Sequence, residues 1–371
     1  MDFDVIVSGL GPAGCTFLRE LRRRNPDLKV LALDRAEFPR HKPCAGGLTP
    51  KAYRLLKELF PELDTVVERR VNRFKLFFKN REVELPSPNP LVYLTKRKRL
   101  DHLLFKLATE NTEVKLGETV LGAEKYKNGW KVKTDKRTYT TKLLIGADGV
   151  NSRLSRQFKV KREIGFTYEV EVEAELNHIT IDFTGFKWGY YWAFPKEGSV
   201  TTGAGEFKRG NFKKLRELTT LLNRKHGLTG RNLWEGGFPI PAGRPECDVQ
   251  RGPLLFLGDA AGLVDPLTGE GIYYAARSGQ IAAAAVSNFF SKGPKALEEY
   301  RVRINREFGG EFRWARVVGW LFFKFPSLNL KVVKNSPQLI KITAELLTGE
   351  LPYRAAFLKF IKLAPKALLK G

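Results

Sequence analysis

The beginning of the chain carries the pattern that most restricts its fold. An apolar run at residues 4–8 leads into residues 9–14, which fit G-x-G-x-x-G, and residues 15–24 follow with the apolar spacing of a helix. A second apolar run at 29–33 ends at Asp34, about 20 residues beyond the glycines, where an acidic side chain can bind ribose hydroxyls. This order predicts a Rossmann-like dinucleotide-binding fold, with a pyrophosphate at the helix N-terminus. The residues expected to bind the dinucleotide are Gly9, Gly11, Ala13, Gly14, Asp34 and Arg35.

A second glycine-rich segment, residues 254–279, predicts which kind of dinucleotide is bound. Its apolar beginning delivers Gly258-Asp259 to a turn, and Gly269-Glu270-Gly271 then opens a helix of small residues. A strand that feeds a helix N-terminus presents free backbone N–H groups, and glycines let the backbone approach a flat ring closely. The segment therefore predicts a flavin site. We expect Asp259 to bind the ribityl hydroxyls, and Gly269, Gly271 and Ile272 to lie beneath the ring.

Three other segments bring polar side chains that suit the same site. The loop after the second strand holds Arg40 and the turn Cys44-Ala45-Gly46-Gly47, whose charge suits a pyrophosphate and whose glycines suit a ring. Arg97 opens a predicted helix and is placed at the flavin's polar flank, while Asp148 follows the apolar strand 143–146. Each segment also has a structural alternative: a solvated charge cluster, a solvated helix end, or an ordinary Asp-Gly turn. Cys44 can equally be a small buried hydrophobe.

Composition limits the classes of protein and partner. With 371 residues and 43% hydrophobic content, the chain can bury a full core. Its 64 Lys and Arg against 40 Asp and Glu give a net charge of +24, which favours an anionic partner such as nucleic acid, phospholipid headgroups or a phosphorylated substrate. The cysteines and histidines show neither a disulfide framework nor metal-ligand spacing, so no metal is expected. We find no signal peptide and no apolar stretch of ~18 residues, and therefore expect a cytoplasmic protein.

The flavin elements are scattered along the chain, which predicts a discontinuous domain with insertions. Segments of strand character lie between them at residues 73–78, 168–176, 188–194 and 199–207. The expected class is α/β: a Rossmann-like FAD-binding domain, an antiparallel-sheet substrate domain, and a helical, basic C-terminal region. The predicted ranges are 1–60, 95–160 and 245–294 for the first, 61–94 and 161–244 for the second, and 295–371 for the third.

Together these motifs resemble the geranylgeranyl reductase family, within the p-hydroxybenzoate hydroxylase-like FAD flavoproteins that also include aromatic hydroxylases and flavin halogenases. The whole group shares the amino-terminal glycines, residues 97–101, 146–149 and Gly258-Asp259. Residues 43–47, with their cysteine-glycine turn, and residues 265–272 are similar to the reductases in particular. Residues 190–195 resemble the Y-x-W-x-F-P signature that lines the isoprenoid pocket. The arginine usual three residues after Ser152 is Ser155 here, with Arg156 displaced by one position.

The resemblance implies FAD-dependent saturation of C=C bonds in geranylgeranyl chains, of archaeal-type digeranylgeranylglycerophospholipid or of geranylgeranyl diphosphate. Such a reaction pairs a hydride from reduced flavin N5 with a proton, for which Cys44, Tyr190 and an ordered water are the alternatives. The residues expected to bind the substrate are Tyr190, Trp192, Phe194 and Pro195. No second G-x-G-x-x-G for a nicotinamide and no cysteine cluster for an iron–sulfur centre is visible, so NADPH or a ferredoxin-like donor is expected to bind transiently and reduce the flavin.

The basic C-terminal region bears on the remaining alternatives. It interleaves lysines with aromatic residues such as Trp314, Trp320 and Phe357, a composition suited to peripheral binding at an anionic membrane inner face. Helices that merely cap the substrate domain with a solvated basic face are an equal alternative. A flavin monooxygenase or halogenase shares the general motifs and is the second functional hypothesis. A nucleic-acid-binding flavoprotein ranks low, because no recognition motif accompanies the charge, and no nucleic acid is expected as a partner.

Overall fold

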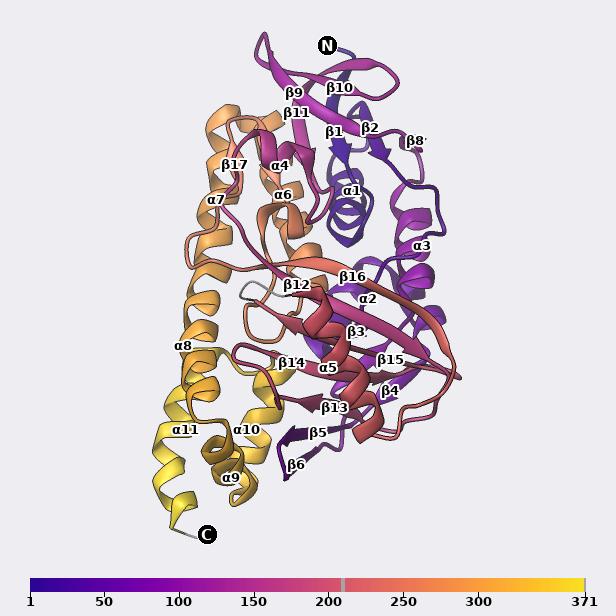
Figure 1. The fold of residues 1–371 in the computed structure, drawn as a ribbon. Coiled ribbons are helices and arrows are strands. Elements are labelled where there is room, and N and C mark those ends of the chain that lie inside the picture. Colours follow the sequence, from indigo (N-terminus) through magenta and orange to yellow (C-terminus); the bar gives the residue numbers. More distant parts are fainter. Residues whose placement is uncertain (208–210, 370–371) are drawn as a thin grey trace.

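The computed structural model describes residues 1–207 and 211–369. A nucleotide lobe built around a parallel sheet lies at one end, and a second sheet, antiparallel except for the parallel pair β13–β5, lies beside it (Figure 1). Helices of the C-terminal region run along one side of both and end beyond the second sheet (Figure 1). This arrangement confirms the predicted combination of a Rossmann-like sheet, an antiparallel sheet and a helical C-terminal region.

The nucleotide sheet has β1 at its centre, paired in parallel with β11 on one side and β2 on the other. These strands are buried along almost their whole length because helices cover them, which explains their nearly continuous apolar sequences. A hairpin of β9 and β10 adds antiparallel strands to β11. The strands are β1 (Phe3–Ser8), β2 (Val30–Asp34), β8 (Glu113–Leu116), β9 (Val120–Tyr126), β10 (Gly129–Thr134), β11 (Thr138–Gly146), β17 (Gln250–Arg251) and β18 (Leu254–Phe256).

Helices α1 and α6 pack so closely that no side chain fits between their backbones at Gly279. Helix α1 (Pro12–Arg24) begins inside the glycine motif rather than at residue 15, because Gly11 serves as N-cap and proline is well placed at the first helical position. Helix α6 (Ile272–Lys292) presents Gly279 to α1, so that an added Cβ would lie 2.5 Å from the Ala13 carbonyl oxygen. Helices α2 (Pro50–Leu59), α3 (Arg97–Ala108) and α4 (Arg153–Gln157), with the short turns η1 (Pro61–Val66) and η2 (Gly258–Ala261), complete the lobe.

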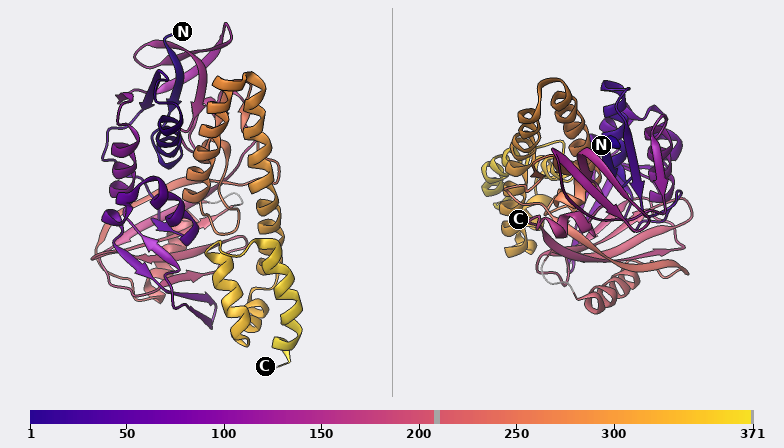
Figure 2. Two further views of the ribbon diagram at one scale, coloured as in Figure 1. Left: turned by 180° about the vertical axis from the view of Figure 1, so that it is seen from behind. Right: turned by 90° about the horizontal axis from the view of Figure 1, so that it is seen from above.

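The second sheet has the strand order β16-β12-β15-β14-β13-β5-β6. Its strands confirm the predicted runs near 73–78, 188–194 and 199–207. Seen from above, helix α5 (Phe212–Lys225) covers its outer face, away from the nucleotide lobe (Figure 2). The strands are β5 (Arg73–Phe78), β6 (Arg81–Pro86), β12 (Glu163–Val172), β13 (Ile179–Asp182), β14 (Gly189–Pro195), β15 (Val200–Glu206) and β16 (Asn232–Ala242).

The alternating strand predicted at 168–176 differs from the structure in its bounds. Strand β12 spans Glu163–Val172 and stops there, because Val172 pairs with Val200 and Asn232 at the starts of both neighbouring strands. Its apolar face packs under α5. The acidic face, which includes Glu169, turns toward the nucleotide lobe instead of solvent, since the Glu169 carboxylate accepts a hydrogen bond from the Cys44 backbone N–H.

The C-terminal region packs across the second sheet and onto the nucleotide lobe. Buried side chains of α9 and α10 join the apolar cluster on β5 and β6. A small sheet of β3 (Gly47–Leu48), β7 (Val92–Leu94) and β4 (Arg69–Val71) links the two lobes. None of the helices in the described parts of the chain is long and apolar enough to cross a membrane. The region comprises η3 (Pro294–Leu297), α7 (Glu298–Ile304), the π-helical η4 (Asn305–Gly309), α8 (Gly310–Lys324), α9 (Pro326–Lys334), α10 (Pro337–Leu347) and α11 (Tyr353–Leu368).

Gly279 and Gly310 provide a matched test of the α1–α6 packing. A Cβ on Gly279 would meet α1 backbone atoms at 2.5 and 2.9 Å, whereas one on Gly310 would meet nothing within 4 Å. We expect Gly279→Ala to lower the free energy of unfolding by about 1 to 3 kcal/mol through overpacking. Gly310→Ala should raise it by up to ~1 kcal/mol, because alanine favours a helix. Chemical denaturation of both variants measures the difference, and equal effects would contradict the packing described.

Candidate active site

The three motif glycines have two different structural roles. Gly9 has φ +101°, and a Cβ there would lie 2.4 Å from the Ala147 carbonyl oxygen; a Cβ on Gly14 would lie 2.0 Å from the Gly9 carbonyl oxygen. At Gly9 and Gly14 the protein's own backbone therefore fills the space that a side chain would need. A Cβ on Gly11 would meet only the Arg40 guanidinium at 3.6 Å, so its backbone faces open space. Because no side chain caps the N-terminus of α1, its first N–H groups remain available to an anion there.

The predicted ribose ligand Asp34 lies at the end of β2 beside the glycine turn. Its carboxylate accepts hydrogen bonds from the Leu10 N–H at 2.7 Å and the Ala36 N–H at 2.9 Å. These bonds fix its orientation and leave further lone pairs for a hydroxyl donor. Arg35 is exposed at the surface and does not line the cavity described below.

Arg97 and Arg40 share one fully buried carboxylate. The Arg97 guanidinium makes two bonds of 2.8 Å to Asp101, and Arg40 Nη2 lies 3.1 Å from Asp101 Oδ2. Burial disfavours the charged carboxylate, yet the two arginines hold the pKa of Asp101 below its ordinary value. Removing one member of such a group leaves an uncompensated buried charge. The cluster therefore fixes the first turn of α3 at the cavity wall, where Arg97 was predicted to meet a ligand.

The Cys44–Gly47 turn is fastened by two charged residues of the second sheet. The Cys44 N–H donates to Glu169 Oε1 at 2.8 Å, and the Gly46 N–H donates to Cys44 Sγ at 3.4 Å. The ammonium of Lys196, which is 2% exposed, donates to the carbonyl oxygens of Ala45 and Thr95. The turn thus lies between the lobes and lines the cavity.

Glu169 and Lys196 were missed by sequence reasoning. Burial raises the pKa of Glu169 to about 7 and lowers the pKa of Lys196 to about 8, so both side chains titrate close to neutral pH. A signal existed for Lys196, which directly follows the Y-x-W-x-F-P run. For Glu169 no signal existed, since the sequence does not show what covers the acidic face of its strand.

The aspartates of the other predicted turns face the same region. Asp259 Oδ2 lies 3.8 Å from Lys42 Nζ at the cavity wall. Burial raises the pKa of Asp148 to about 6, and its Oδ1 is buried without a hydrogen-bond partner among the described residues. Arg162 donates to the carbonyl oxygens of Val150 and Asp259 at 2.9 and 3.3 Å. It therefore brings a positive charge to this turn, although sequence reasoning did not identify it.

The position where Ser155 replaces the family's arginine has a structural role. Its hydroxyl is buried and donates to the Ala260 carbonyl oxygen at 2.7 Å, which ties α4 to the turn after β18. Arg156, displaced by one position, is exposed.

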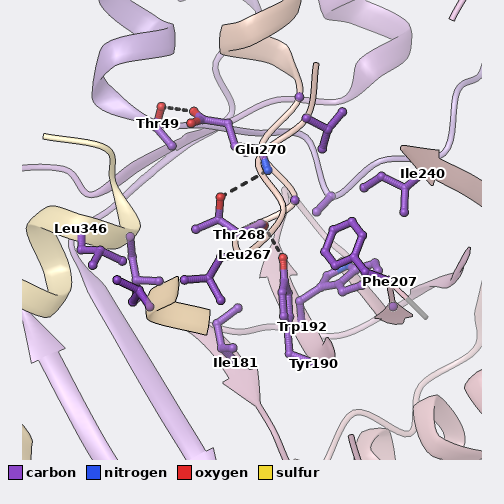
Figure 3. A pocket seen from close by; sticks show the side chains of 18 of the residues that line it. Thr49, Ile181, Tyr190, Trp192, Phe207, Ile240, Leu267, Thr268, Glu270 and Leu346 are labelled. Carbon is purple, nitrogen blue, oxygen red and sulfur yellow. Dashed lines mark hydrogen bonds between the residues drawn. The ribbon is translucent and has the colours of Figure 1, made fainter. Parts of the chain in front are cut away.

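The loop before α6 is held from both sides. Asp265 Oδ1 accepts the N–H groups of Leu267 and Thr268 at 2.8 and 2.9 Å. The Tyr190 hydroxyl donates to the Thr268 carbonyl oxygen, next to Gly269 with φ +71° (Figure 3). Helix α6 then begins at Ile272, and its N-cap Gly271 has no side-chain cap bond. No side chain therefore occupies the N-terminus of α6, where the sequence analysis expects a flavin ring.

A large apolar cavity of about 820 Å³ connects these parts. It extends from Gly11 and the Cys44 turn, past Tyr190 and Trp192, to side chains of α8 through α11. Figure 3 shows its middle part, with Tyr190 and Trp192 of β14 and Leu346 of α10. The Trp192 ring fits against β15 because Gly203 lies opposite: a Cβ there would be 2.4 Å from the ring. The glycines of β15 therefore make room for the aromatic wall.

The predicted site residues divide into those that line the cavity and those that do not. The lining includes Gly11, Ala13, Cys44, Ala45, Gly46, Gly47, Arg97, Asp259, Gly269, Gly271, Ile272, Tyr190, Trp192 and Phe194. Gly9, Gly14, Asp34, Arg40 and Asp148 lie behind it in the nucleotide lobe. Pro195 alternates with Phe194 along β14, so it points to the opposite face of the strand.

The residues fit FAD. Gly11 leaves space for a phosphate, the N-termini of α1 and α6 are uncapped by side chains, and Asp148 Oδ1 has no partner among the described residues. Each of these is a backbone or side-chain group that a bound dinucleotide can satisfy.

Comparisons with known proteins decide the family. No protein-family model matches the chain. A geranylgeranyl diphosphate reductase from Rhodobacter capsulatus is 30% identical over 343 residues, which cover 86% of this chain and 84% of the relative. The chain belongs to the geranylgeranyl reductase family. It is therefore an oxidoreductase of this type, a FAD-dependent reductase of isoprenoid chains.

Other relatives of the reductase differ in their named substrates. A menaquinone reductase from Mycolicibacterium smegmatis is 30% identical over 336 residues, covering 81% of each chain. Digeranylgeranylglycerophospholipid reductase 2 from Methanopyrus kandleri is 28% identical over 374 residues, covering 91% of this chain and 90% of the relative. The crystal structure of a geranylgeranyl bacteriochlorophyll reductase-like protein from Thermoplasma acidophilum has a TM-score of 0.82 at 22% identity, covering 97% and 99% of the two chains. At that identity the crystal structure shows a shared fold alone.

Alanine at Gly11 and at Gly14 separates ligand approach from packing. Gly14→Ala should destabilise the FAD-free protein, because the new Cβ meets the Gly9 carbonyl oxygen at 2.0 Å. Gly11→Ala should leave that stability within ~0.5 kcal/mol, as at an unconstrained site, and yet weaken FAD binding at least about tenfold by blocking close backbone approach. Thermal unfolding and a fluorescence titration with FAD measure the two effects. Unchanged FAD affinity of Gly11→Ala would show that the cradle lies elsewhere.

Proposed function

We propose that the reductase saturates C=C bonds in the geranylgeranyl chains of membrane lipids, with archaeal-type digeranylgeranylglycerophospholipid or geranylgeranyl diphosphate as substrate. The observation that supports this most is the single apolar cavity that joins the cofactor cradle to the C-terminal helices. A long isoprenoid can extend along such a cavity, with one alkene at a time beside the Cys44 turn. Relatives named for a geranylgeranyl diphosphate and for a digeranylgeranyl phospholipid support the same substrate class.

The reaction sets three tasks for the protein. A trisubstituted alkene has no carbonyl to draw in a hydride; FAD, when bound and reduced, supplies that hydride. The chain's own residues must hold the alkene, exclude water and deliver a proton to the other carbon. Trp192 and Phe194 form the wall against which the alkene packs.

Cys44 and Tyr190 are assigned different parts in this proposal. The Cys44 thiol belongs to the cavity wall and stays our proposed proton donor to the alkene. The Tyr190 hydroxyl is engaged with the Thr268 carbonyl oxygen, and burial raises the pKa of this phenol. We therefore propose Tyr190 as a positioning residue for the loop before α6.

The far end of the cavity opens among exposed apolar side chains. Phe325, Leu328, Ile361 and Leu368 both line the cavity and are exposed to solvent. Trp320 and Leu358 are exposed nearby on α8 and α11, and Lys359, Lys362 and Lys366 of α11 are exposed beside them. Exposed apolar groups surrounded by lysines suit an anionic lipid surface. We propose peripheral binding at the cytoplasmic membrane face, with the cavity mouth toward the lipid, and NADPH or a ferredoxin-like protein as reductant.

Anaerobic incubation tests the substrate class directly. The chemically reduced holoenzyme is mixed with geranylgeranyl diphosphate or with digeranylgeranyl phospholipid, and products are analysed by mass spectrometry. We expect mass gains in steps of two hydrogens, because each saturated double bond takes up one hydride and one proton. A menaquinone serves as the comparison substrate. If only the quinone gains hydrogens, the membrane-lipid assignment is wrong.

Liposome co-sedimentation tests the membrane proposal. The double variant Trp320→Asp/Leu358→Asp changes exposed side chains that do not line the cavity. We expect it to lose most binding to vesicles containing phosphatidylglycerol, because burial of two large apolar side chains, worth roughly 1.5 to 3 kcal/mol each, is lost. The control is Leu221→Asp on α5, which alters a side chain 61% exposed at the outer face of the second sheet. Equal binding by all three proteins would refute the proposed orientation.

A further inference from the structure

A second, polar cavity adjoins the apolar cavity and shares wall residues with it. Its volume is about 300 Å³, and its lining includes Lys51, Asp265, Tyr273, Glu307, Glu311 and Tyr353. Two residues of the loop before α6, Thr268 and Glu270, line both cavities. The loop is therefore a thin partition between a charged compartment and the apolar reaction space.

Glu270 connects the two cavities through a continuous hydrogen-bonded chain. Lys51, which lines the polar cavity, places Nζ 2.8 Å from Glu270 Oε2. The Thr49 hydroxyl, at the wall of the apolar cavity, donates to Glu270 Oε1 (Figure 3). Each oxygen of the carboxyl group thus faces a partner in a different compartment.

Lys51 is held at the polar end by packing. Its ammonium lies 4.4 Å from the Tyr273 ring centre and 4.9 Å from that of Tyr274, within cation–π range. Gly349 leaves the space that the Lys51 side chain occupies, because a Cβ on Gly349 would lie 2.4 Å from Lys51 Cε. The π-helical turn η4, a rare form often found at functional sites, contributes Glu307 to the same cavity.

We propose that Lys51, Glu270 and Thr49 form the route by which protons enter the apolar cavity, an inference that rests on the proposed alkene reduction. Saturation of each double bond consumes one proton in a space whose lining is mostly apolar. In one transfer, the Thr49 hydroxyl turns from Glu270 toward the cavity and releases its proton there, while protonated Glu270 gives its own proton to Thr49 Oγ1. Glu270 then takes a proton from Lys51 or water in the polar cavity, and solvent restores it. The net change is one proton moved inward, with no change in oxidation state.

The electrostatics of Glu270 suit a proton carrier. Burial raises the pKa of Glu270, and the bonds from Lys51 and Thr49 only partly oppose this. Burial also works against the Lys51 ammonium, but Glu270 and Asp265 together raise the pKa of Lys51. The groups facing Glu270 are Lys51 of α2, Asp265 of its own loop, Tyr273 and Tyr274 of α6, and Tyr353 of α11. Because the pKa is raised, transfer should fail as pH rises through it.

Glu270→Gln is the decisive variant, because its carbonyl oxygen can accept from Lys51 while its NH2 group donates to the Thr49 hydroxyl, but the amide cannot pass a proton. The first measurement needs no prenyl substrate: FAD in the holoenzyme is photoreduced, and proton uptake from solution is followed with an indicator dye. We expect uptake to slow at least about tenfold in Glu270→Gln and Thr49→Val, in keeping with proton-transfer residues elsewhere. Thr49→Ser should restore it. The matched control Glu311→Gln removes a carboxylate from the same polar cavity and should leave uptake unchanged.

The second measurement is the pH profile of prenyl saturation. Wild type should lose activity on the alkaline side of the Glu270 pKa, and Glu270→Gln should be slow and lack this limb. If the wild type fails to saturate any prenyl chain, the proposed function is wrong. The measurement of proton uptake with the indicator dye still tests the proton route in that case. If Glu270→Gln takes up protons at the wild-type rate, the route is refuted whatever the substrate. Should Glu270→Gln not retain FAD, Thr49→Val, which leaves the Lys51–Glu270 pair intact, decides in the same way.

Discussion

The structure depends on the way the second sheet is fastened to the nucleotide lobe at the Cys44–Gly47 turn. Two oppositely charged side chains make this joint: Glu169 accepts the Cys44 N–H, and Lys196 donates to the carbonyl oxygens of Ala45 and Thr95. Burying both charges is costly, which is why their pKa values move toward neutrality. The backbone groups they satisfy are those of the turn that must approach the cofactor. Cavity shape and cofactor cradle are therefore set by one set of bonds.

A second fastening joins the C-terminal helices to the cofactor loop. The Tyr353 hydroxyl at the start of α11 donates to Asp265 at 2.9 Å, and Asp265 in turn holds the N–H groups of Leu267 and Thr268. The helices that wall the far end of the cavity are thus bonded to the loop at its near end. A change in the packing of α11 would be felt at Thr268 and Gly269 through a single carboxylate.

Local patterns predicted the nucleotide lobe well, because each of its parts is a short-range feature. The glycines, the β1–α1–β2 order and Asp34 lie within one continuous segment, and the family resemblance supplied the aromatic strand. What the sequence could not show depends on pairing across long separations. Glu169 meets Cys44 across 125 positions, and Glu270 meets Thr49 across 221. The burial of Glu169 on β12 had no local signal for that reason, and Arg162 had none to distinguish it from Arg156.

Alkene reduction makes two opposite demands on one space, and the loop at residues 268–270 is where they meet. The alkene needs dry, apolar walls, which the aromatic residues of β14 and the C-terminal helices provide. The proton needs a polar path, which an apolar wall cannot offer. A carboxyl group between the two cavities resolves the conflict, because it stays buried, keeps both oxygens hydrogen-bonded, and has a raised pKa. Because the proton supply lies behind the loop, the part of the cavity wall formed by β14 and the C-terminal helices can remain apolar.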